Sequence, residues 1–304
     1  MQLGTSTFIW VSPFSSKRLD LFAHAARLGS DVLEICIEDP ALIRPDEIAE
    51  AAASAGIGVS VCGAFGPSRD LSSEDPAVRA QGLVYLRTCI DIAAEVGSTL
   101  VSGPMYSATG KTRLVPGDAR KQQREWAADG IRRAADYAAL HGVRLAIEPL
   151  NRYETDLVNT VSQGMDLCEQ VGRDNVGLLL DTFHMNIEEK HIAEAIRLGG
   201  DRLLEFHACE NDRGTPASGH VEWGEVFDAL VQVGFDGLIA LEAFTPEIEE
   251  IARAVSMWRP VAASGDALVE DGLRFLRSEL GARGVTFAAG GAAVSPSQRT
   301  GVSR

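Results

Sequence analysis

A short apolar segment followed by an amphipathic, helix-like segment recurs eight times along the chain, and this repeat constrains the fold more than any other feature. Each unit is about 30 residues long, enough for one strand, one crossover helix and two loops. The expected strands are residues 3–10, 32–37, 58–64, 99–105, 144–150, 176–183, 203–208 and 238–244. Glycines stand where each expected helix ends and the next strand begins, at Gly29, Gly56, Gly97, Gly142, Gly172, Gly199 and Gly234.

This regularity predicts an α/β fold of the (β/α)8 TIM-barrel type, formed by a single catalytic domain over residues 1–283. A doubly wound open sheet is the alternative. It would carry a glycine-rich phosphate loop after the first strand, and the segment WVSPF at residues 10–14 offers none. Residues 284–304 are rich in Gly, Ala and Ser, so we expect a flexible C-terminal tail there. The polar connection at residues 107–122 is expected to cover the barrel mouth.

The charge and the cysteines limit the partners and the compartment. Among 304 residues, a net charge of −15 argues against nucleic acid and anionic membranes as partners, because both require clustered Lys and Arg. A small molecule is the expected partner. Five cysteines without a CxxC pair indicate reduced thiols in the cytoplasm. Neither a leader-like N-terminus nor an apolar run of about 18 residues is present, so export and membrane insertion are not expected.

Four polar residues each close an apolar strand segment: Glu148 in LAIEPLNRYE, Asp181 in GLLLDTFHMN, His207 in LLEFHACEND and Glu242 in LIALEAF. The steps from 148 to 181, from 181 to 207 and from 207 to 242 are each close to one repeat of about 31 residues. The four residues therefore belong to the last four strands, one on each. Because the carboxyl ends of barrel strands meet at one mouth, we expect these side chains to converge.

Three converging carboxylates would repel one another and partly protonate unless a cation neutralised them. One such carboxylate by itself could equally pair with a nearby arginine or cap a helix, but four at the same strand position favour a common site. Three oxygen ligands and one nitrogen ligand suit Mn²⁺, Co²⁺ or Mg²⁺, whereas a structural zinc site would favour thiolates. We expect one divalent cation, with Mn²⁺ as the first choice.

Several segments carry a resemblance to a known family: IEPLNRYET, LDTFHMNIEE, HACENDRGTPASGHVEW and the late RAVSMWR. With them, the chain resembles the D-tagatose/D-allulose (psicose) 3-epimerase group of the xylose-isomerase-like sugar isomerase/epimerase superfamily. The resemblance spans most of the first 280 residues, and LDTFHMNIEE is its most specific segment. It implies a metal-dependent ketose epimerase that forms homodimers or homotetramers.

The resemblance also implies individual roles. The four strand-end residues would be the metal ligands, and the two glutamates among them, Glu148 and Glu242, would also act as acid and base. Glu154, His184 and Arg213 would contact sugar hydroxyls.

The residues alone leave the roles of Glu154 and Arg213 open. Glu154 could orient a ligand or simply pair with Arg152. Arg213 could neutralise charge on a substrate oxygen, or it could pair with Glu210 or Asp212 in the same loop.

Two aromatic residues and one histidine complete the expected sugar site. His184 lies three residues past Asp181, where it would either donate to a substrate oxygen or lie on a surface loop. Phe244 shares the strand parity of Glu242 and is expected to point inward beside the metal. Trp10 is expected to pack against an apolar face of the sugar.

Inversion of a carbon beside a ketone requires a proton to leave from one face and return on the other, through an enediolate. Glu148 and Glu242 close the fifth and eighth strands, so they can flank a sugar whose enediolate charge the metal stabilises as a Lewis acid. The same chemistry would also serve a hydroxypyruvate-type aldose/ketose isomerase or a keto-sugar or keto-inositol dehydratase. A metal-dependent endonuclease fits the acidic charge poorly, and a non-catalytic sugar-binding barrel is the last alternative.

Overall fold

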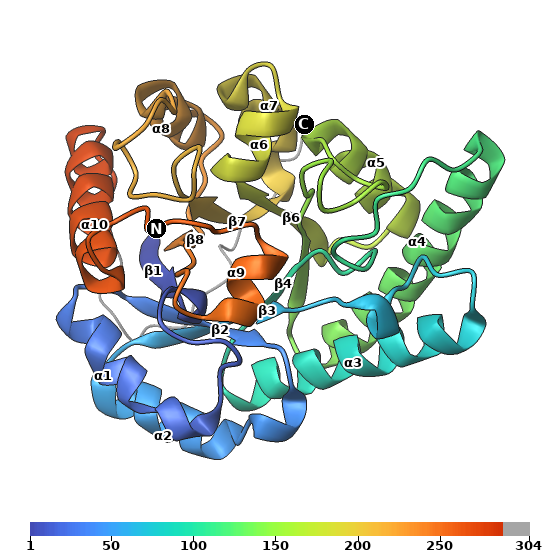
Figure 1. The fold of residues 1–304 in the computed structure, drawn as a ribbon, viewed down its shortest axis with the longest axis horizontal. Coiled ribbons are helices and arrows are strands. Elements are labelled where there is room, and N and C mark those ends of the chain that lie inside the picture. Colours follow the sequence, from blue (N-terminus) through green and yellow to red (C-terminus); the bar gives the residue numbers. More distant parts are fainter. Residues whose placement is uncertain (288–304) are drawn as a thin grey trace, which may run out of the picture.

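The computed structural model describes residues 1–287, which form a closed barrel of eight parallel strands in the order of the chain (Figure 1). The predicted (β/α)8 TIM barrel in a single domain is confirmed. The strands are β1 (Gln2–Ser6), β2 (Val32–Ile37), β3 (Gly58–Gly63), β4 (Leu100–Gly103), β5 (Arg144–Ile147), β6 (Val176–Asp181), β7 (Leu203–Ala208) and β8 (Leu238–Leu241).

One helix follows each strand on the outside of the barrel, and two further helices lie in loops at its mouth. The outer helices are α1 (Asp20–Arg27), α2 (Pro45–Ala55), α3 (Pro76–Glu95), α4 (Gly117–Leu140), α5 (Val161–Val171), α7 (Ile192–Gly199), α8 (Trp223–Gln232) and α10 (Gly265–Ala282). The loop helices are α6 (Thr182–Glu188) and α9 (Glu249–Ala254). Short 3₁₀ helices are η1 (Thr7–Ile9), η2 (Ser16–Arg18), η3 (Pro40–Leu42), η4 (Pro67–Arg69) and η5 (Gly200–Arg202).

Several predicted strands were too long at their carboxyl ends. β1 stops at Ser6, whose side chain accepts from the backbone N–H of Phe8 and starts η1. β5 stops at Ile147, two residues before Pro149, which has no N–H for a ladder hydrogen bond. The expected strands 58–64, 99–105, 176–183 and 238–244 likewise end at residues 63, 103, 181 and 241. The site residues after β5 and β8 therefore lie just beyond the ladder.

One predicted glycine turn was also misplaced by a residue. Gly199 is the last residue of α7 and has a helical φ of −61°, whereas Gly200 has a φ of 47° and makes the turn. The other six predicted glycines all have positive φ. A side chain would be strained in that conformation, so glycine is favoured at these helix ends for a physical reason.

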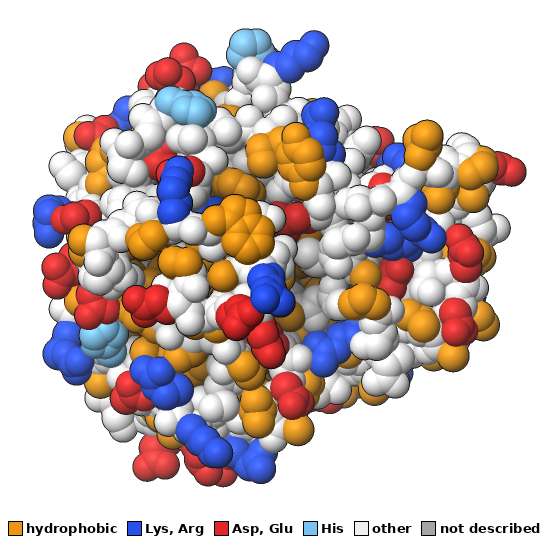
Figure 2. Space-filling view, viewed as in Figure 1, with side chains coloured by type: hydrophobic (Ala, Val, Ile, Leu, Met, Phe, Trp, Pro, Cys, Tyr) orange, Lys and Arg blue, Asp and Glu red, His pale blue; other side chains and the backbone are white. Residues whose placement is uncertain are grey.

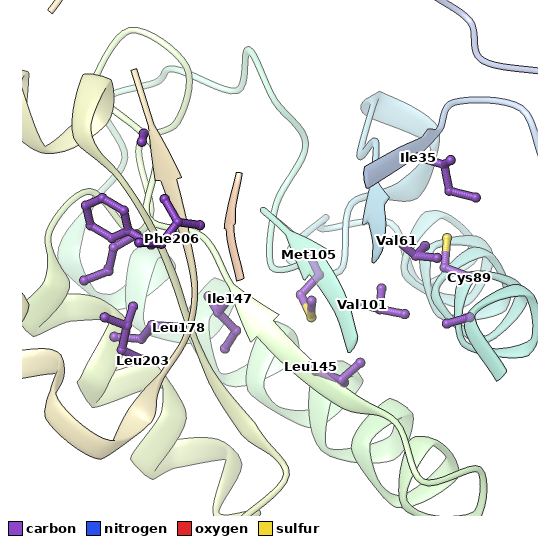
Figure 3. Close-up of a cluster of buried hydrophobic side chains, with 14 of the residues drawn as sticks. Ile35, Val61, Cys89, Val101, Met105, Leu145, Ile147, Leu178, Leu203 and Phe206 are labelled. Carbon is purple, nitrogen blue, oxygen red and sulfur yellow. The ribbon is translucent and has the colours of Figure 1, made fainter. Parts of the chain in front are cut away.

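Successive strand residues alternate between the helices and the barrel interior. The outward set packs into the main hydrophobic core (Figure 3) and includes Ile35, Val61, Val101, Leu145, Leu178 and Phe206. The inward set forms two small apolar clusters, one of Val32, Leu238 and Ala240, the other of Leu100, Ala146 and Leu179. Above these clusters the interior becomes polar, because the inward positions nearer the mouth carry acids, serines and a histidine.

The outer surface carries both signs of charge. Figure 2 shows acidic and basic side chains interspersed over the face on which α9 lies in front of the strands. Within residues 1–287, no helix combines the length and apolar composition needed to cross a membrane.

The first residues of the predicted tail pack onto the barrel. Val285 and Phe287 still pack against the main core, and Arg277 lies 5.3 Å from the Phe287 ring centroid. The rest of the predicted tail, residues 288–304, lies outside the described residues.

Candidate metal and sugar site

The structure brings the four predicted strand-end residues together at the carboxyl end of the barrel. Glu148 follows β5, Asp181 ends β6, His207 lies in β7 and Glu242 follows β8. One side-chain oxygen or nitrogen of each lies within 4.8 Å of the others, and all four side chains are buried. Strand parity explains the convergence, because each residue is two positions after an inward-facing neighbour on its own strand.

The donor set fits a divalent cation. His207 Nδ1 is buried, has no hydrogen-bond partner, and lies 3.8 Å from Asp181 Oδ2 and 3.7 Å from Glu242 Oε2. Its other ring nitrogen, Nε2, lies 2.9 Å from Glu34 Oε2. An unpartnered ring nitrogen facing carboxylate oxygens is the arrangement that a cation of the Mn²⁺ or Mg²⁺ type would complete.

Arg213 supplies the positive charge that faces this cluster. Its Nη1 donates to Asp181 Oδ2 at 2.6 Å and to Glu242 Oε2 at 2.7 Å. The guanidinium carbon lies 4.3 Å from the ring centroid of Phe183 and 5.1 Å from that of Phe244. The arginine is thus held by two carboxylates and by aromatic faces, and it lies within the site.

The alternative partners considered for Arg213 are engaged elsewhere. The Trp223 indole N–H donates to Glu210 at 2.7 Å, and Arg259 donates to Asp212 at 3.2 Å. The side chain of Arg213 is therefore free to face the cluster.

Asn151 orders two of the other predicted sugar contacts. Its Nδ2 donates to Glu154 Oε1 at 2.8 Å and lies 2.9 Å from His184 Nδ1, which also accepts from the Asn151 backbone N–H at 3.1 Å. Arg152, the alternative partner of Glu154, pairs instead with Glu188 at 2.9 Å. Both predicted contacts are thereby held toward the cavity.

His184 lies in the first turn of α6 and is only 2% exposed, so the surface-loop alternative is wrong. Since Nδ1 accepts from Asn151, the ring proton is on Nε2, which lies 3.6 Å from Glu148 Oε1. Arg213 has only donors, so its 3.1 Å contact with this Nε2 is not a hydrogen bond in that tautomer. His184 therefore presents an N–H donor to the site.

A cavity of about 390 Å³ opens above the cluster. Its lining includes Glu148, Glu154, His184, Arg213, Glu242, Phe8, Phe244 and Cys62, together with Thr109 and Gly110 of the β4–α4 loop and Ile251, Ala254 and Val255 in and after α9. The predicted loop 107–122 thus contributes one wall. Helix α9, which was not predicted from the sequence, closes another side. Phe8 also lies in this lining, with its ring centroid 5.2 Å from that of Phe244.

The structure does not bring Trp10 to this cavity. Its indole N–H donates to Asp266 Oδ1 at 2.8 Å, and its ring meets His24 edge-on. Trp10 instead lines a neighbouring hollow beside α10. Another hollow, of about 450 Å³, lies at the opposite end of the strands, and its lining has no cluster of acids or histidines.

Burial and neighbouring charges shift the pKa values of the two glutamates in opposite directions. Burial, reinforced by the charge of Glu242, holds the pKa of Glu148 well above its usual range. Burial acts in the same sense on Glu242, but Arg213 and His207 outweigh it and lower the pKa of Glu242 to about 2. Burial, with Arg213, lowers the pKa of His184 to about 3. One glutamate thus favours the neutral form and the other the ionised form.

The sequence analysis missed an acidic layer just below the cluster. Glu34 of β2 and Glu205 of β7 are fully buried, and Ser60 of β3 donates to Glu205 at 3.2 Å. Burial, with the charge of Glu34, raises the pKa of Glu205 to about 8. The available signal was a single acid inside each of two apolar strands, in VLEICI and LLEFHA.

Comparisons with known proteins agree with this geometry. Residues 22–279 match the family described as "Xylose isomerase-like TIM barrel". A probable ketose 3-epimerase from Synechocystis sp. is 33% identical, over 91% of this chain and 96% of that protein. A solved L-ribulose 3-epimerase superposes with a TM-score of 0.88 at 30% identity, covering 92% of this chain and 95% of that one.

A third similar protein was solved with a sugar bound. The D-allulose 3-epimerase from Methylomonas sp., solved in complex with D-allulose, has a TM-score of 0.86 at 32% identity and covers 92% of this chain and 97% of its own. The family resemblance predicted from the sequence is confirmed.

Proposed function

Because the chain belongs to the xylose isomerase-like TIM barrel family and is an enzyme of the isomerase class, we propose that it inverts C3 of a free ketose. The substrate would be of the D-allulose/D-fructose, D-tagatose or L-ribulose type. The relatives named above, a ketose 3-epimerase, an L-ribulose 3-epimerase and a D-allulose 3-epimerase, support this choice.

One observation carries the proposal: two glutamates from different strands of the barrel mouth face one cavity. Glu148 follows β5 and Glu242 follows β8, three strands apart around the ring. An acid that holds a proton on one side of the cavity and an ionised base on the other are what a proton exchange between two faces of one carbon requires. Epimerisation runs in both directions, so the two glutamates exchange roles when product returns to substrate.

The chain's own residues would perform the proton steps. Glu242 removes the C3 proton from one face, and Glu148 returns a proton to the other. His184 donates its Nε2–H to a sugar oxygen, and Glu154 accepts from a hydroxyl. Phe244 packs against the apolar edge of the sugar.

We propose that Glu148, Asp181, His207 and Glu242 hold the cation, with Mn²⁺ as the first choice and Co²⁺ or Mg²⁺ as alternatives. When bound, a divalent cation supplies Lewis acidity toward the carbonyl and hydroxyl oxygens beside C3. Arg213 then neutralises further negative charge that develops on the substrate.

A ketose panel followed by NMR in D₂O tests the reaction. The purified protein, stripped with EDTA and reloaded with Mn²⁺, is expected to exchange deuterium into C3 only and to lose turnover without metal. Deuterium at C1 or C2 instead would indicate an aldose/ketose isomerase, and loss of water a dehydratase. Glu148→Gln and Glu242→Gln are each expected to abolish turnover, and full activity in either would refute the acid/base assignment.

We also propose a homodimer or homotetramer in the cytoplasm. Exposed Leu140 and Trp258 are apolar side chains that an interface would cover, and all five cysteines are buried and unpaired. Light scattering after size exclusion tests the assembly, and a monomeric mass would refute it.

A further inference from the structure

Glu34 lies inside the barrel because its strand neighbours point outward. In β2, Ile35 packs into the main core, so the adjacent Glu34 faces the barrel axis. It contacts His207 of β7, a strand that is not next to β2 in the barrel. The contact therefore crosses the interior of the barrel.

The contact fixes one side of the His207 ring. Nε2 and Glu34 Oε2 are 2.9 Å apart, and both side chains are fully buried. A carboxylate oxygen accepts, so Nε2 donates its hydrogen downward into the barrel. Nδ1, on the opposite side of the ring, faces Asp181 and Glu242 without a hydrogen-bond partner.

We propose that Glu34 is the positioning residue of the metal site: it orients the His207 ring and holds the hydrogen on Nε2, so that the lone pair of Nδ1 points at the cation. The inference rests on the proposed metal site. Carboxylates that hold the far nitrogen of a ligand histidine typically account for about 10- to 100-fold in metal affinity. Glu34 does not line the cavity and is not one of the four clustered residues, and it contacts the cluster through His207, so its effect passes through His207.

Two variants of Glu34 separate its role as hydrogen-bond acceptor for His207 from the effect of its side-chain volume. Glu34→Leu keeps similar volume but leaves Nε2–H without an acceptor, and we expect Mn²⁺ affinity to fall about 10- to 100-fold. Glu34→Gln keeps a carbonyl oxygen for Nε2–H, and its amide can donate to Glu205, whose Oε2 has no partner. We expect Glu34→Gln to retain most of the affinity.

Glu205→Gln is the matched control. Glu205 is equally buried and belongs to the same acidic layer, within 4.8 Å of Glu34 and His207, but it accepts from Ser60 rather than from the His207 ring. It is expected to bind Mn²⁺ nearly as tightly as the wild type. If Glu205→Gln weakens binding as much as Glu34→Leu, loss of buried acid in general explains the effect, and the specific role of Glu34 is overturned.

The measurements are Mn²⁺ titration by EPR of the free ion and NMR of the protein labelled with ¹⁵N-histidine. In the metal-free wild type we expect a slowly exchanging ring N–H signal, shifted downfield by its carboxylate acceptor, that disappears in Glu34→Leu. Its absence from the wild type would overturn the proposal even if a variant failed to fold. Wild-type Mn²⁺ affinity in folded Glu34→Leu would also overturn it.

Failure of the wild type to bind Mn²⁺ would instead refute the metal site, while the N–H signal still tests the Glu34 contact. With saturating Mn²⁺, kcat of Glu34→Leu should return toward the wild-type value. The Mn²⁺ concentration that this variant needs for activity should stay above that of the wild type.

Discussion

Removal of the Arg213 side chain is expected to destabilise the metal-free enzyme strongly. Arg213 Nη1 lies 2.6 Å from Asp181 Oδ2 and 2.7 Å from Glu242 Oε2, and these three side chains are at most 7% exposed. Arg213→Ala would leave two carboxylates buried close together without their cation. Removal of one partner from a buried ion pair costs about 3–5 kcal/mol.

The pKa of Glu242 gives a similar magnitude for the stability that depends on this ion pair. The fold lowers this pKa from 4.5 to about 2, mainly through Arg213 and then His207, against the opposing effect of burial. At 1.36 kcal/mol per pKa unit, this corresponds to about 3 kcal/mol of stability at neutral pH. Because the pKa is depressed in the folded state, the stability is present above pH 4.5 and is lost as the pH falls toward 2. Without Arg213, much of this dependence of stability on pH should disappear.

Urea unfolding at pH 7 in EDTA measures the effect, with Arg259→Ala as the matched control. Arg259 pairs with Asp212 at 3.2 Å, but its side chain is 66% exposed, so its loss should cost no more than about 1 kcal/mol. With Mn²⁺ added, the cation would neutralise the carboxylates, and the gap between Arg213→Ala and the wild type should narrow. Equal stability of the two alanine variants in EDTA would refute the reasoning, as would a gap unchanged by Mn²⁺.

Three other substitutions have defined consequences. Asn151→Ala removes side-chain hydrogen bonds that hold Glu154 and His184, and kcat/KM for the ketose should fall about tenfold, since each buried hydrogen bond contributes about 1 kcal/mol; an unchanged kcat/KM would contradict this. Lys111→Met leaves Asp70 buried without its 2.8 Å partner, so urea unfolding should show a loss of about 3–5 kcal/mol, and a loss below 1 kcal/mol would argue against a buried pair. Gly103→Ala would place a Cβ 2.7 Å from a backbone oxygen of β3 at a φ of 120°, and thermal unfolding should begin well below the wild-type temperature.

The barrel and the four strand-end residues were predictable because both follow from periodicity. A repeat of one strand and one helix fixes the topology, and strand parity sends residues two positions apart to the same side. Spacing of about one repeat therefore brought Glu148, Asp181, His207 and Glu242 to one mouth. Their convergence needs only the order of the strands.

Contacts that depend on the register between distant strands were not predictable. Glu34 and His207 are separated by 173 residues, and their meeting depends on how β2 and β7 are staggered across a closed barrel. The placement of Trp10 failed for a related reason. The strand that was expected to carry it ended at Ser6, and η1 turned the chain toward α10.

The acidic layer nevertheless follows physically from a histidine at this position. An imidazole has two ring nitrogens, and when Nδ1 faces a cation at the mouth, Nε2 carries a hydrogen that points into the barrel. A buried ring N–H needs an acceptor, and in the barrel interior a side chain of another strand can provide it. Glu34 provides it at 2.9 Å. An acid in the middle of an otherwise apolar barrel strand is therefore a signal to look for a ligand histidine across the barrel, even when the sequence does not say on which strand.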